Sequence, residues 1–316
     1  MIVGIDIGGT KALAVMMNPT SNLVEASVVA PSSGSGSELV ESIVELITQL
    51  DDQTTAPIDA VGLAVAGLVT SEGSVRYSPN LPSLREFPLR KRLSNAIGLP
   101  VVVANDATAG TIAEAEIGAG KGCKNFVFVS LGTGIGTGLV VDGHLLKGSN
   151  GFAGESGHMT INYDGELHVT DRRGPWEMYG SGSALTHMVR QAISAKIVSL
   201  DELNVGHIDD IVGSHLVSAM TSGNKQAEEI FSRFCKDVAI GMSNLVMVVD
   251  PSLIVIGGGL VNIGSPLIEG VRDWLLKIVV GVEHRDPVRL ELSPLGSAGC
   301  AIGAAILTKS LVKKPS

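Results

Sequence analysis

Aromatic and basic residues are both scarce in this chain. Phe, Trp and Tyr make up 3% of the 316 residues, and 23 Lys and Arg face 32 Asp and Glu, which gives a net charge of -9. A general nucleic-acid binder uses a basic surface and aromatic rings for stacking. The composition therefore argues against a nucleic-acid partner and predicts that an anionic ligand is held by backbone dipoles or a metal ion.

Cysteines and long hydrophobic runs are also few. Cys123, Cys235 and Cys300 lie far apart, and no pair has metal-ligand spacing. This favours reduced thiols in the cytoplasm over a disulfide framework. The uncharged run 125–141 is short for a membrane span and is broken by glycines, and Asp6 lies in a first apolar run that has no basic leader. We expect a soluble, cytoplasmic protein that does not bind membranes.

Glycine, in contrast, is abundant and unevenly placed, with 12 of the 39 glycines between Gly118 and Gly157. The chain alternates strand-like and helix-like segments, as α/β folds do. At this length two domains are more common than one. Expected strands are 2–7, 12–17, 58–65, 100–104, 126–131, 138–141 and 253–256, and expected helices are 39–50, 106–117, 224–249 and 298–311.

Three glycine turns follow strands that we expect to be buried. They are Gly8-Gly9, followed by Thr10 and Lys11; Gly132-Thr133-Gly134; and Gly257-Gly258-Gly259. Successive glycines let backbone N–H groups converge on phosphate, and Asp6 just before the first turn could hold a divalent cation. One such turn alone is more often an ordinary hairpin. Three of them favour a nucleotide cleft, although none is a P-loop or a dinucleotide fingerprint.

Polar residues gather at three further places. Asn105 and Asp106 join a strand to a helix, where they fit a helix cap, a general base, or both. Glu155 and His158 could share one face of a short helical turn, although such a pair more often lies on the surface without a function. Glu177, before a Gly-Ser-Gly turn, is a third candidate carboxylate.

The order of these motifs resembles the ROK family (repressor, open reading frame, kinase), especially its bacterial glucokinases. The matching segments are Asp6 to Lys11, Ser78 to Pro82, Asn105 to Ala107, Leu131 to Gly134, Gly154 to His158 and Ile256 to Gly259. The resemblance implies an actin-like ATPase (ribonuclease H-like) α/β fold with two domains, 1–115 plus 300–316 and 116–299, flanking a nucleotide and sugar cleft. It also implies a homodimer or homotetramer.

The resemblance further implies ATP- and Mg²⁺-dependent phosphorylation of a hexose at its 6-hydroxyl, with glucose as the leading candidate. Asp106 would be the catalytic base. The sugar would contact Asn105, Glu155, His158 and Glu177, with Asn80 and the Gly67 backbone nearby. The nucleotide phosphates and Mg²⁺ would lie at Asp6, Gly8, Gly9, Thr10, Lys11, Gly132, Thr133 and Gly134, with Asp6 holding the metal indirectly, and Gly257, Gly258 and Gly259 would border the adenosine.

One departure concerns the structural zinc that family members usually hold with a histidine, here His158, and three cysteines. The matching cysteine positions carry His168, Thr170 and Pro175. Because Thr and Pro cannot replace thiolates, we expect no structural zinc. His158 and His168 alone would leave a tetrahedral site half empty, so the loop needs another brace, such as packing of Trp176 and the fixed φ of Pro175.

One alternative to the phosphorylation of glucose stays open, and two others are disfavoured. The sugar could be mannose, fructose or an N-acetylhexosamine, because one sequence does not rank pocket shapes. A non-catalytic sugar-binding protein is conceivable, although Asp6, Asn105, Asp106, Glu155 and His158 are all present. A sugar-responsive repressor would need a helix-turn-helix domain, for which we expect no room before a hairpin that begins near Met1.

Overall fold

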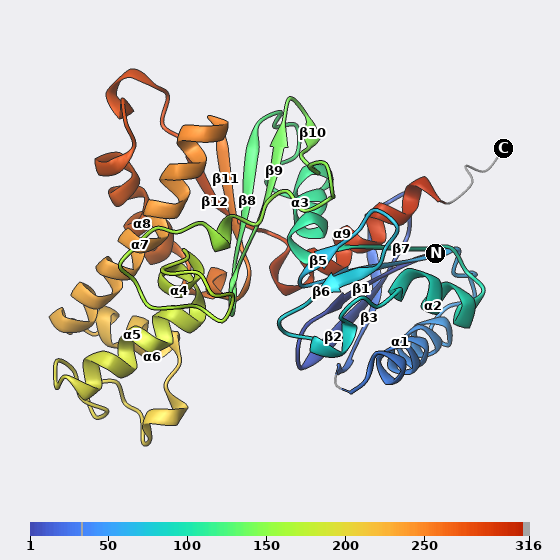
Figure 1. The fold of residues 1–316 in the computed structure, drawn as a ribbon, viewed down its shortest axis with the longest axis horizontal. Helices are drawn as coiled ribbons and strands as arrows, with labels where there is room; N and C mark the ends of the chain where they lie inside the picture. The colour runs from blue at the N-terminus through green and yellow to red at the C-terminus, as the bar shows by residue number, and fades with distance from the viewer. Residues whose placement is uncertain (33, 312–316) are drawn as a thin grey trace. The chain divides into compact units, whose positions relative to one another are not determined.

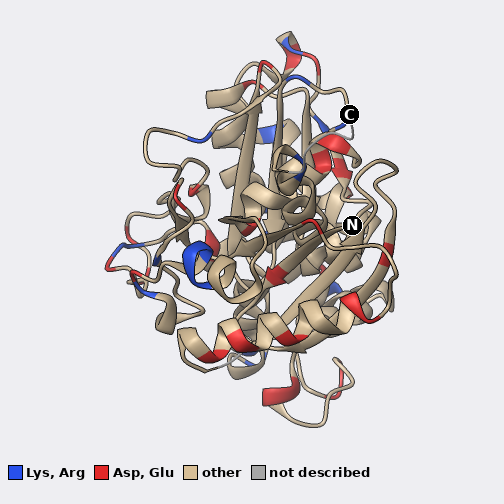
Figure 2. Ribbon diagram, turned by 90° about the vertical axis from the view of Figure 1, so that its right-hand side faces the viewer, with Lys and Arg blue, Asp and Glu red and all other residues tan. Residues whose placement is uncertain are grey.

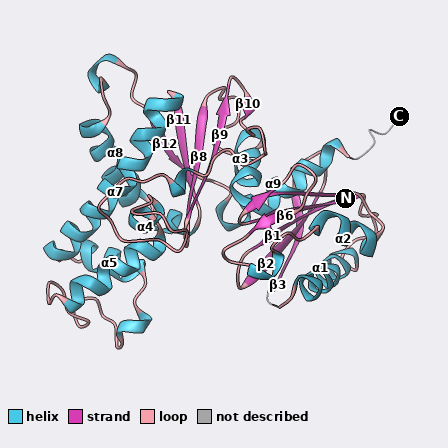
Figure 3. Ribbon diagram, in the orientation of Figure 1, coloured by secondary structure: helices cyan, strands magenta, loops and turns pink. Residues whose placement is uncertain are grey.

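The computed structural model describes residues 1–32 and 34–311 (Figure 1). Among these residues, 1–32, 34–124, 138–154 and 293–311 form one compact unit, and Asn125–Thr137 with Glu155–Leu292 form the other. Strands and helices occur in both (Figure 3). The division expected from the sequence, 1–115 plus 300–316 and 116–299, stays a prediction about domains.

The first sheet is built around the N-terminal strand. Its order is β3-β2-β1-β4-β7, with β1 antiparallel to β2 and parallel to β4, which is parallel to β7. The strands are β1 Ile2–Ile7, β2 Lys11–Met17, β3 Val24–Pro31, β4 Ala60–Val65 and β7 Val101–Asn105, and a separate pair is β5 Leu68–Val69 with β6 Val75–Tyr77. The predicted N-terminal hairpin is confirmed, whereas the edge strand β3 was not predicted.

One face of this sheet is covered by α1 (Gly36–Asp51) and α2 (Leu89–Ile97). A capping box formed by Ser35 and Glu38 starts α1. The apolar residues of α1 then recur at helical spacing, so Leu39 and Ile43 are buried in one cluster with Val3 of β1. The helix predicted from this spacing is confirmed.

The other face is covered by α9 (Gly299–Leu307), with α3 (Asp106–Glu116) packed beside it (Figure 1). A Cβ at Gly4 of β1 would lie 1.9 Å from the Ala301 carbonyl oxygen, and one at Gly62 of β4 would lie 1.9 Å from that of Ala304. Only glycine permits this approach. The final helix is shorter than the predicted 298–311, because its last turn tightens to a 3₁₀ turn at Thr308–Ser310.

The second sheet has the order β10-β9-β8-β11-β12, with β8, β11 and β12 parallel. Its strands are β8 Phe126–Leu131, β9 Ile135–Val141, β10 His144–Leu145, β11 Leu253–Gly257 and β12 Arg289–Leu292. Of this sheet, β8, β11, β12 and the start of β9 belong to the second unit, and the rest of β9 and β10 belong to the first. The second unit contains the helices α4 Glu177–Gly180, α5 Gly182–Ser194, α6 Gly213–Thr221, α7 Lys225–Val249 and α8 Ser265–Ile278. The longest predicted helix is confirmed as α7, which Asn224 caps and which Asp250, in the left-handed region, ends.

The placement of charged residues and the polarity of the helices agree with what the composition predicts. In the view of Figure 2, Lys and Arg lie at scattered points among Asp and Glu. Across residues 1–32 and 34–311, no helix combines the length and apolarity that crossing a membrane requires.

Candidate functional site

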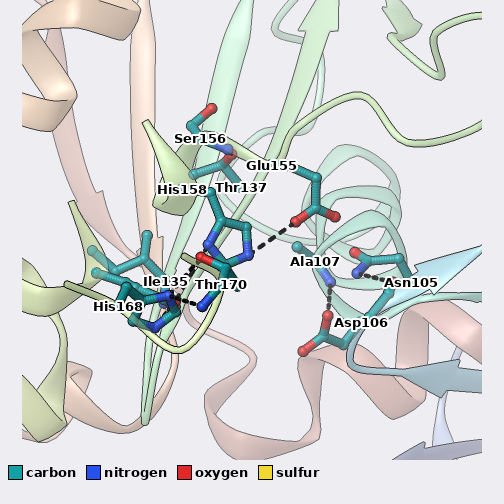
Figure 4. A network of polar contacts seen from close by, with 12 residues as sticks. Asn105, Asp106, Ala107, Ile135, Thr137, Glu155, Ser156, His158, His168 and Thr170 are labelled. Carbon is teal, nitrogen blue, oxygen red and sulfur yellow. Dashed lines mark hydrogen bonds and ion pairs between the residues drawn. The ribbon is translucent and has the colours of Figure 1, made fainter. Parts of the chain in front are cut away.

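The junction between β7 and α3 positions Asn105 and Asp106. The Asn105 side-chain oxygen accepts a hydrogen bond from Thr108 N at 3.1 Å, and its amide donates to the Gly67 carbonyl at 3.0 Å. Asp106 is the first residue of α3, and its Oδ1 accepts from Ala107 N at 2.9 Å (Figure 4). The predicted helix cap is confirmed, and two residues expected near the sugar, Asn105 and Gly67, are in direct contact.

Two carboxyl groups of the first unit, those of Asp6 and Asp106, have raised pKa values. Burial raises the pKa of Asp6, at the end of β1, to about 7, and the charge of Asp106 adds to this effect while Lys11 opposes it. Burial also raises the pKa of Asp106, against hydrogen bonds to the α3 start that lower it. A carboxyl with a raised pKa suits general-base chemistry near neutral pH, and a cation beside the pair would relieve the repulsion.

Sequence reasoning did not place Cys300 at this site, although it lies near the same two carboxyl groups. The pKa of its thiol is raised well above its usual value by burial and then by Asp6, Asp106 and Glu114. The start of α9 therefore lies beside the two carboxyls, and its cysteine remains an uncharged thiol. A hydrophobic helix near the end of the chain carries no local signal for this.

The turn between β1 and β2 is a hairpin turn closed by a hydrogen bond from Gly8 N to the Lys11 carbonyl at 3.0 Å. Thr10 and Lys11 are exposed. A Cβ at Gly9 would lie 3.2 Å from the backbone oxygen of Asn80, whose residue is exposed. The turn and Asn80 are thus neighbours, and the turn's predicted role in binding phosphate stays a prediction.

In the second unit, a 3₁₀ turn at Ser156–His158 brings Glu155 and His158 together. Their Oε2 and Nε2 atoms are 3.8 Å apart (Figure 4). The predicted shared face is confirmed. Glu177 begins α4, and its Oε1 lies 3.3 Å from His158 Nδ1 and 3.2 Å from His168 Nε2.

Glu177 also contacts the turn between β8 and β9. Its Oε2 accepts a hydrogen bond from Ile135 N at 3.4 Å. A Cβ at Gly134 would lie 2.5 Å from the same oxygen, so a side chain there would displace the carboxylate. A predicted sugar ligand and a predicted phosphate turn are therefore adjacent within one unit, which the sequence alone does not indicate.

Trp176 anchors the segment that carries Glu177. Its side chain is fully buried, and its Nε1 donates to the Asp237 carbonyl at 3.1 Å. A Cβ at Gly241 would lie 2.0 Å from the indole ring, so α7 accepts the ring only because this position has no side chain. The expected bracing by Trp176 is confirmed, and Pro175 forms a β-bridge with Thr160.

A pocket of about 640 Å³ lies beside the β8–β9 turn in the second unit. The start of α5 adjoins this turn, because Gly182 N donates to the Gly132 carbonyl at 2.7 Å. The lining residues are Gly132, Thr133, Gly182, Ser183, Thr186, His187, Arg190, Val212 and Gly213. Sequence reasoning missed the α5 residues, although the Gly-Ser-Gly turn before them was a signal. Gly257, Gly258 and Gly259 end β11 and start a 3₁₀ turn outside this lining.

The residues at the zinc positions do not fit a thiolate site. Of the matching positions, His158 and His168 offer zinc donors, whereas the Thr170 hydroxyl lies 2.8 Å from His168 Nδ1 and Pro175 has no donor. Cys235, the cysteine of α7, is buried, which raises its pKa to about 12.

Comparisons with known proteins agree on one family. A family model described as ROK family matches residues 2–311. The chain is 32% identical to the glucokinase of Streptomyces coelicolor over 98% of both chains. A crystal structure of a ROK family glucokinase from Streptomyces griseus, in complex with glucose and AMPPNP, has a TM-score of 0.88 and 30% identity over 97% of this chain and 98% of that one.

Repressors are similar as well. The xylose repressor of Bacillus subtilis is 29% identical over 74% of this chain and 56% of its own length. The matches to glucokinases cover nearly the full length of both chains, and they support a sugar kinase. With the two-sheet architecture they also confirm the expected α/β, actin-like ATPase fold.

Proposed function

The chain belongs to the ROK family, and from this premise we propose that it is an ATP-dependent hexose kinase that converts glucose to glucose 6-phosphate. The observation that carries the proposal is Asp106. Its carboxyl lies at the carboxyl end of a parallel strand, with a pKa that burial raises. Open α/β sheets bind ligands at such strand ends.

Asp106 would accept the proton of the attacking 6-hydroxyl as the phosphoryl group is transferred. Phosphoryl transfer depends mainly on positioning and charge stabilisation, so one oriented carboxylate is sufficient as the base. Asn105 would bind the same end of the sugar, with Asn80 and the Gly67 backbone nearby. Its hydrogen bonds to Gly67 and Thr108 hold the amide in place.

Glu155, His158 and Glu177 would bind the other ring hydroxyls. Carboxylates and imidazoles accept hydrogen bonds from hydroxyl groups, and His158 lies within ion-pairing range of both carboxylates. A sugar whose hydroxyls match this set would gain bonds that an epimer loses. We place specificity among hexoses here.

ATP phosphates would lie against the Gly8 to Lys11 turn and the Gly132 to Gly134 turn, with Gly257 to Gly259 bordering the adenosine. The pocket beside Gly132 adds hydroxyl groups and the backbone of the α5 start, suited to a polar ligand. When bound, Mg²⁺ would neutralise phosphate charge, and Asp6 would hold it indirectly.

The remaining assignments are proposals of the same kind. We place the enzyme in the cytoplasm as a homodimer or homotetramer. It would have no structural zinc, because the thiolate positions hold His168, Thr170 and Pro175. Kinases for mannose, fructose or an N-acetylhexosamine are the first alternatives, and a non-catalytic sugar-binding protein is the second.

A coupled assay of ADP release across a hexose panel tests the function. We expect turnover with ATP, Mg²⁺ and glucose, and slower turnover with the other hexoses. A folded sample that turns over none of the hexoses, yet binds one by calorimetry, would favour the non-catalytic alternative. Fastest turnover of another hexose would reassign the substrate and keep the reaction.

A further inference from the structure

Three side chains of the second unit direct ligand atoms at a common point. Nitrogens of His158 and His168 and a carboxylate oxygen of Glu177 all lie within 4.8 Å of one another. Glu177 Oε1 is 3.3 Å from His158 Nδ1 and 3.2 Å from His168 Nε2. Ligand bonds of about 2.0–2.2 Å at tetrahedral angles separate neighbouring donors by about 3.3 Å. The two spacings from Glu177 to the histidines are therefore those of ligands around one ion.

The inner nitrogen of His158 gives a second, independent indication. Nδ1 is buried and has no hydrogen-bond partner, even though a carboxylate oxygen lies 3.3 Å away. Buried polar atoms are nearly always hydrogen-bonded, so an orphan needs an explanation. A metal ion between the ring and the carboxylate would supply the missing partner.

The outer nitrogen of His168 has the kind of partner that a metal-bound histidine usually has. His168 Nδ1 lies 2.8 Å from the Thr170 hydroxyl, which can accept the ring proton, while the Thr170 backbone N–H, at 3.4 Å, is a longer contact that competes for the same nitrogen. A hydroxyl that accepts the proton of the outer nitrogen leaves the inner nitrogen free to bind a metal. His158 Nε2 is 3.8 Å from Glu155, an ion-pair distance rather than a hydrogen bond.

We propose that His158, His168 and Glu177 form an exchangeable site for a divalent transition metal such as Zn²⁺ or Co²⁺. Two imidazoles and one carboxylate leave a coordination position open, unlike the closed four-ligand sets of structural zinc. The three side chains are 17% to 37% exposed, so the ion can enter and leave. The site therefore differs from the thiolate zinc whose ligands this chain lacks.

The ion would compete with the hexose, a consequence that rests on the proposed function. His158 and Glu177 are assigned to sugar hydroxyls, and a bound metal would use the same Nδ1 and Oε1 atoms. Metal binding should therefore weaken hexose binding, and hexose should weaken metal binding by the same factor.

The test of the site is a Co²⁺ titration of the full chain after removal of metals by EDTA. We expect visible d–d absorption that saturates at one equivalent, without an intense thiolate-to-metal charge-transfer band. His168→Ala should weaken Co²⁺ binding at least 100-fold, and Thr170→Val roughly 10-fold. His207→Ala, at an exposed histidine, is the matched control and should bind as the wild type does.

Circular dichroism must show that each variant is folded. A folded wild type that binds no Co²⁺, or equal binding by wild type and His168→Ala, would overturn the proposal. A thiolate charge-transfer band would also overturn it, because cysteine would then be a ligand.

Calorimetry with glucose, with and without Zn²⁺, tests the competition separately. We expect Zn²⁺ to weaken glucose binding to the wild type at least 10-fold and to leave His168→Ala unaffected. Unchanged glucose binding in the presence of bound Zn²⁺ would overturn the competition. If no hexose binds while Co²⁺ still does, the proposed function fails and the metal site stands.

Discussion

The candidate carboxylates Asp106 and Glu177 are held by different means. Asp106 sits on a strand–helix junction, where backbone hydrogen bonds and the Asn105 cap determine its position. Glu177 begins a helix of four residues and is positioned by Ile135 N, two histidines and the buried Trp176 next to it. Regular structure thus positions the proposed base, whereas long-range side-chain contacts position the proposed sugar ligand.

The largest expected effect is on rate, at the backbone-held carboxylate. Asp106→Asn keeps the size and hydrogen-bonding geometry of the side chain and removes its basicity. We expect kcat to fall by about 10²–10⁴-fold while glucose binding persists. ADP-release kinetics and calorimetry measure the two quantities. Loss of binding equal to the loss of rate would mean that Asp106 is a sugar ligand rather than a base.

The next effect is on stability, at the anchor of Glu177. Trp176→Ala removes a fully buried ring and leaves a cavity against α7, which should lower the free energy of unfolding by about 3–5 kcal/mol. Trp274→Ala is the control, because Trp274 is partly exposed between Lys236 and Lys277. Urea unfolding of both variants should show the smaller loss at Trp274. Equal losses would mean that Trp176 is no special anchor.

A paired glycine experiment tests how finely Glu177 is placed. A methyl group at Gly134 would meet Glu177 Oε2, whereas one at Gly132 would find open space. Gly134→Ala should raise the KM for glucose roughly 10–100-fold by displacing the carboxylate. Gly132→Ala should leave that KM within about 2-fold, since no atom lies within 4 Å of the added methyl. If both variants raise it equally, the turn itself rather than Glu177 sets sugar affinity.

The carboxyl group of Asp6 should lower the free energy of unfolding at neutral pH. Its pKa is about 7 in the folded chain against 3.8 as the ordinary value, so the folded state loses stability relative to the unfolded state as pH rises from about 4 to 7. Asp6→Asn should therefore stabilise the metal-free protein by about 1–3 kcal/mol above pH 7 and by nothing near pH 4. Thermal unfolding across this range measures it, with Asp201→Asn at an exposed loop as the control. A gain that does not vary with pH would exclude this linkage.

The smallest expected effect is on the free energy of unfolding, at the helix cap Asn105 next to Asp106. Asn105→Ala removes a helix cap and should cost about 1 kcal/mol, as should Asn224→Ala at the start of α7. Only Asn105→Ala should also slow turnover, because its amide is tied to Gly67. Denaturant unfolding and kinetics of both variants separate the cap from the site. Normal turnover by Asn105→Ala would restrict Asn105 to its structural role.

Local sequence patterns predicted the elements that rely on local physics. The β1–β2 hairpin, α1 and α7 follow from alternation, helical spacing and end signals, as does the cap at Asn105. The edge strand β3 was missed, although its residues alternate in exposure. The contacts of Glu177 with Ile135 and His168 were not predictable, because they join segments that share no pattern.

The same limit applies to the metal ligands. Family spacing pointed to His158 and His168, but a carboxylate nine residues after His168 had no reason in the sequence to turn toward both. The bridge between Thr160 and Pro175, the anchoring of Trp176 and the hydrogen bond from Ile135 N hold Glu177 at that point. The sequence spacing therefore indicated two metal donors in the loop, whereas the structure brings three together.

The close approach of α9 to Gly4 and Gly62 has a consequence for biosynthesis. Strands β1 and β4 leave the ribosome more than 200 residues before α9, the helix that covers one of their faces. Until then, the apolar side chains on that face, such as Ile2 and Val15, lack their native partner. Folding of the first unit is thus non-local and must await the synthesis of α9, so nascent chains that stall before Gly299 should be prone to aggregate or to need a chaperone.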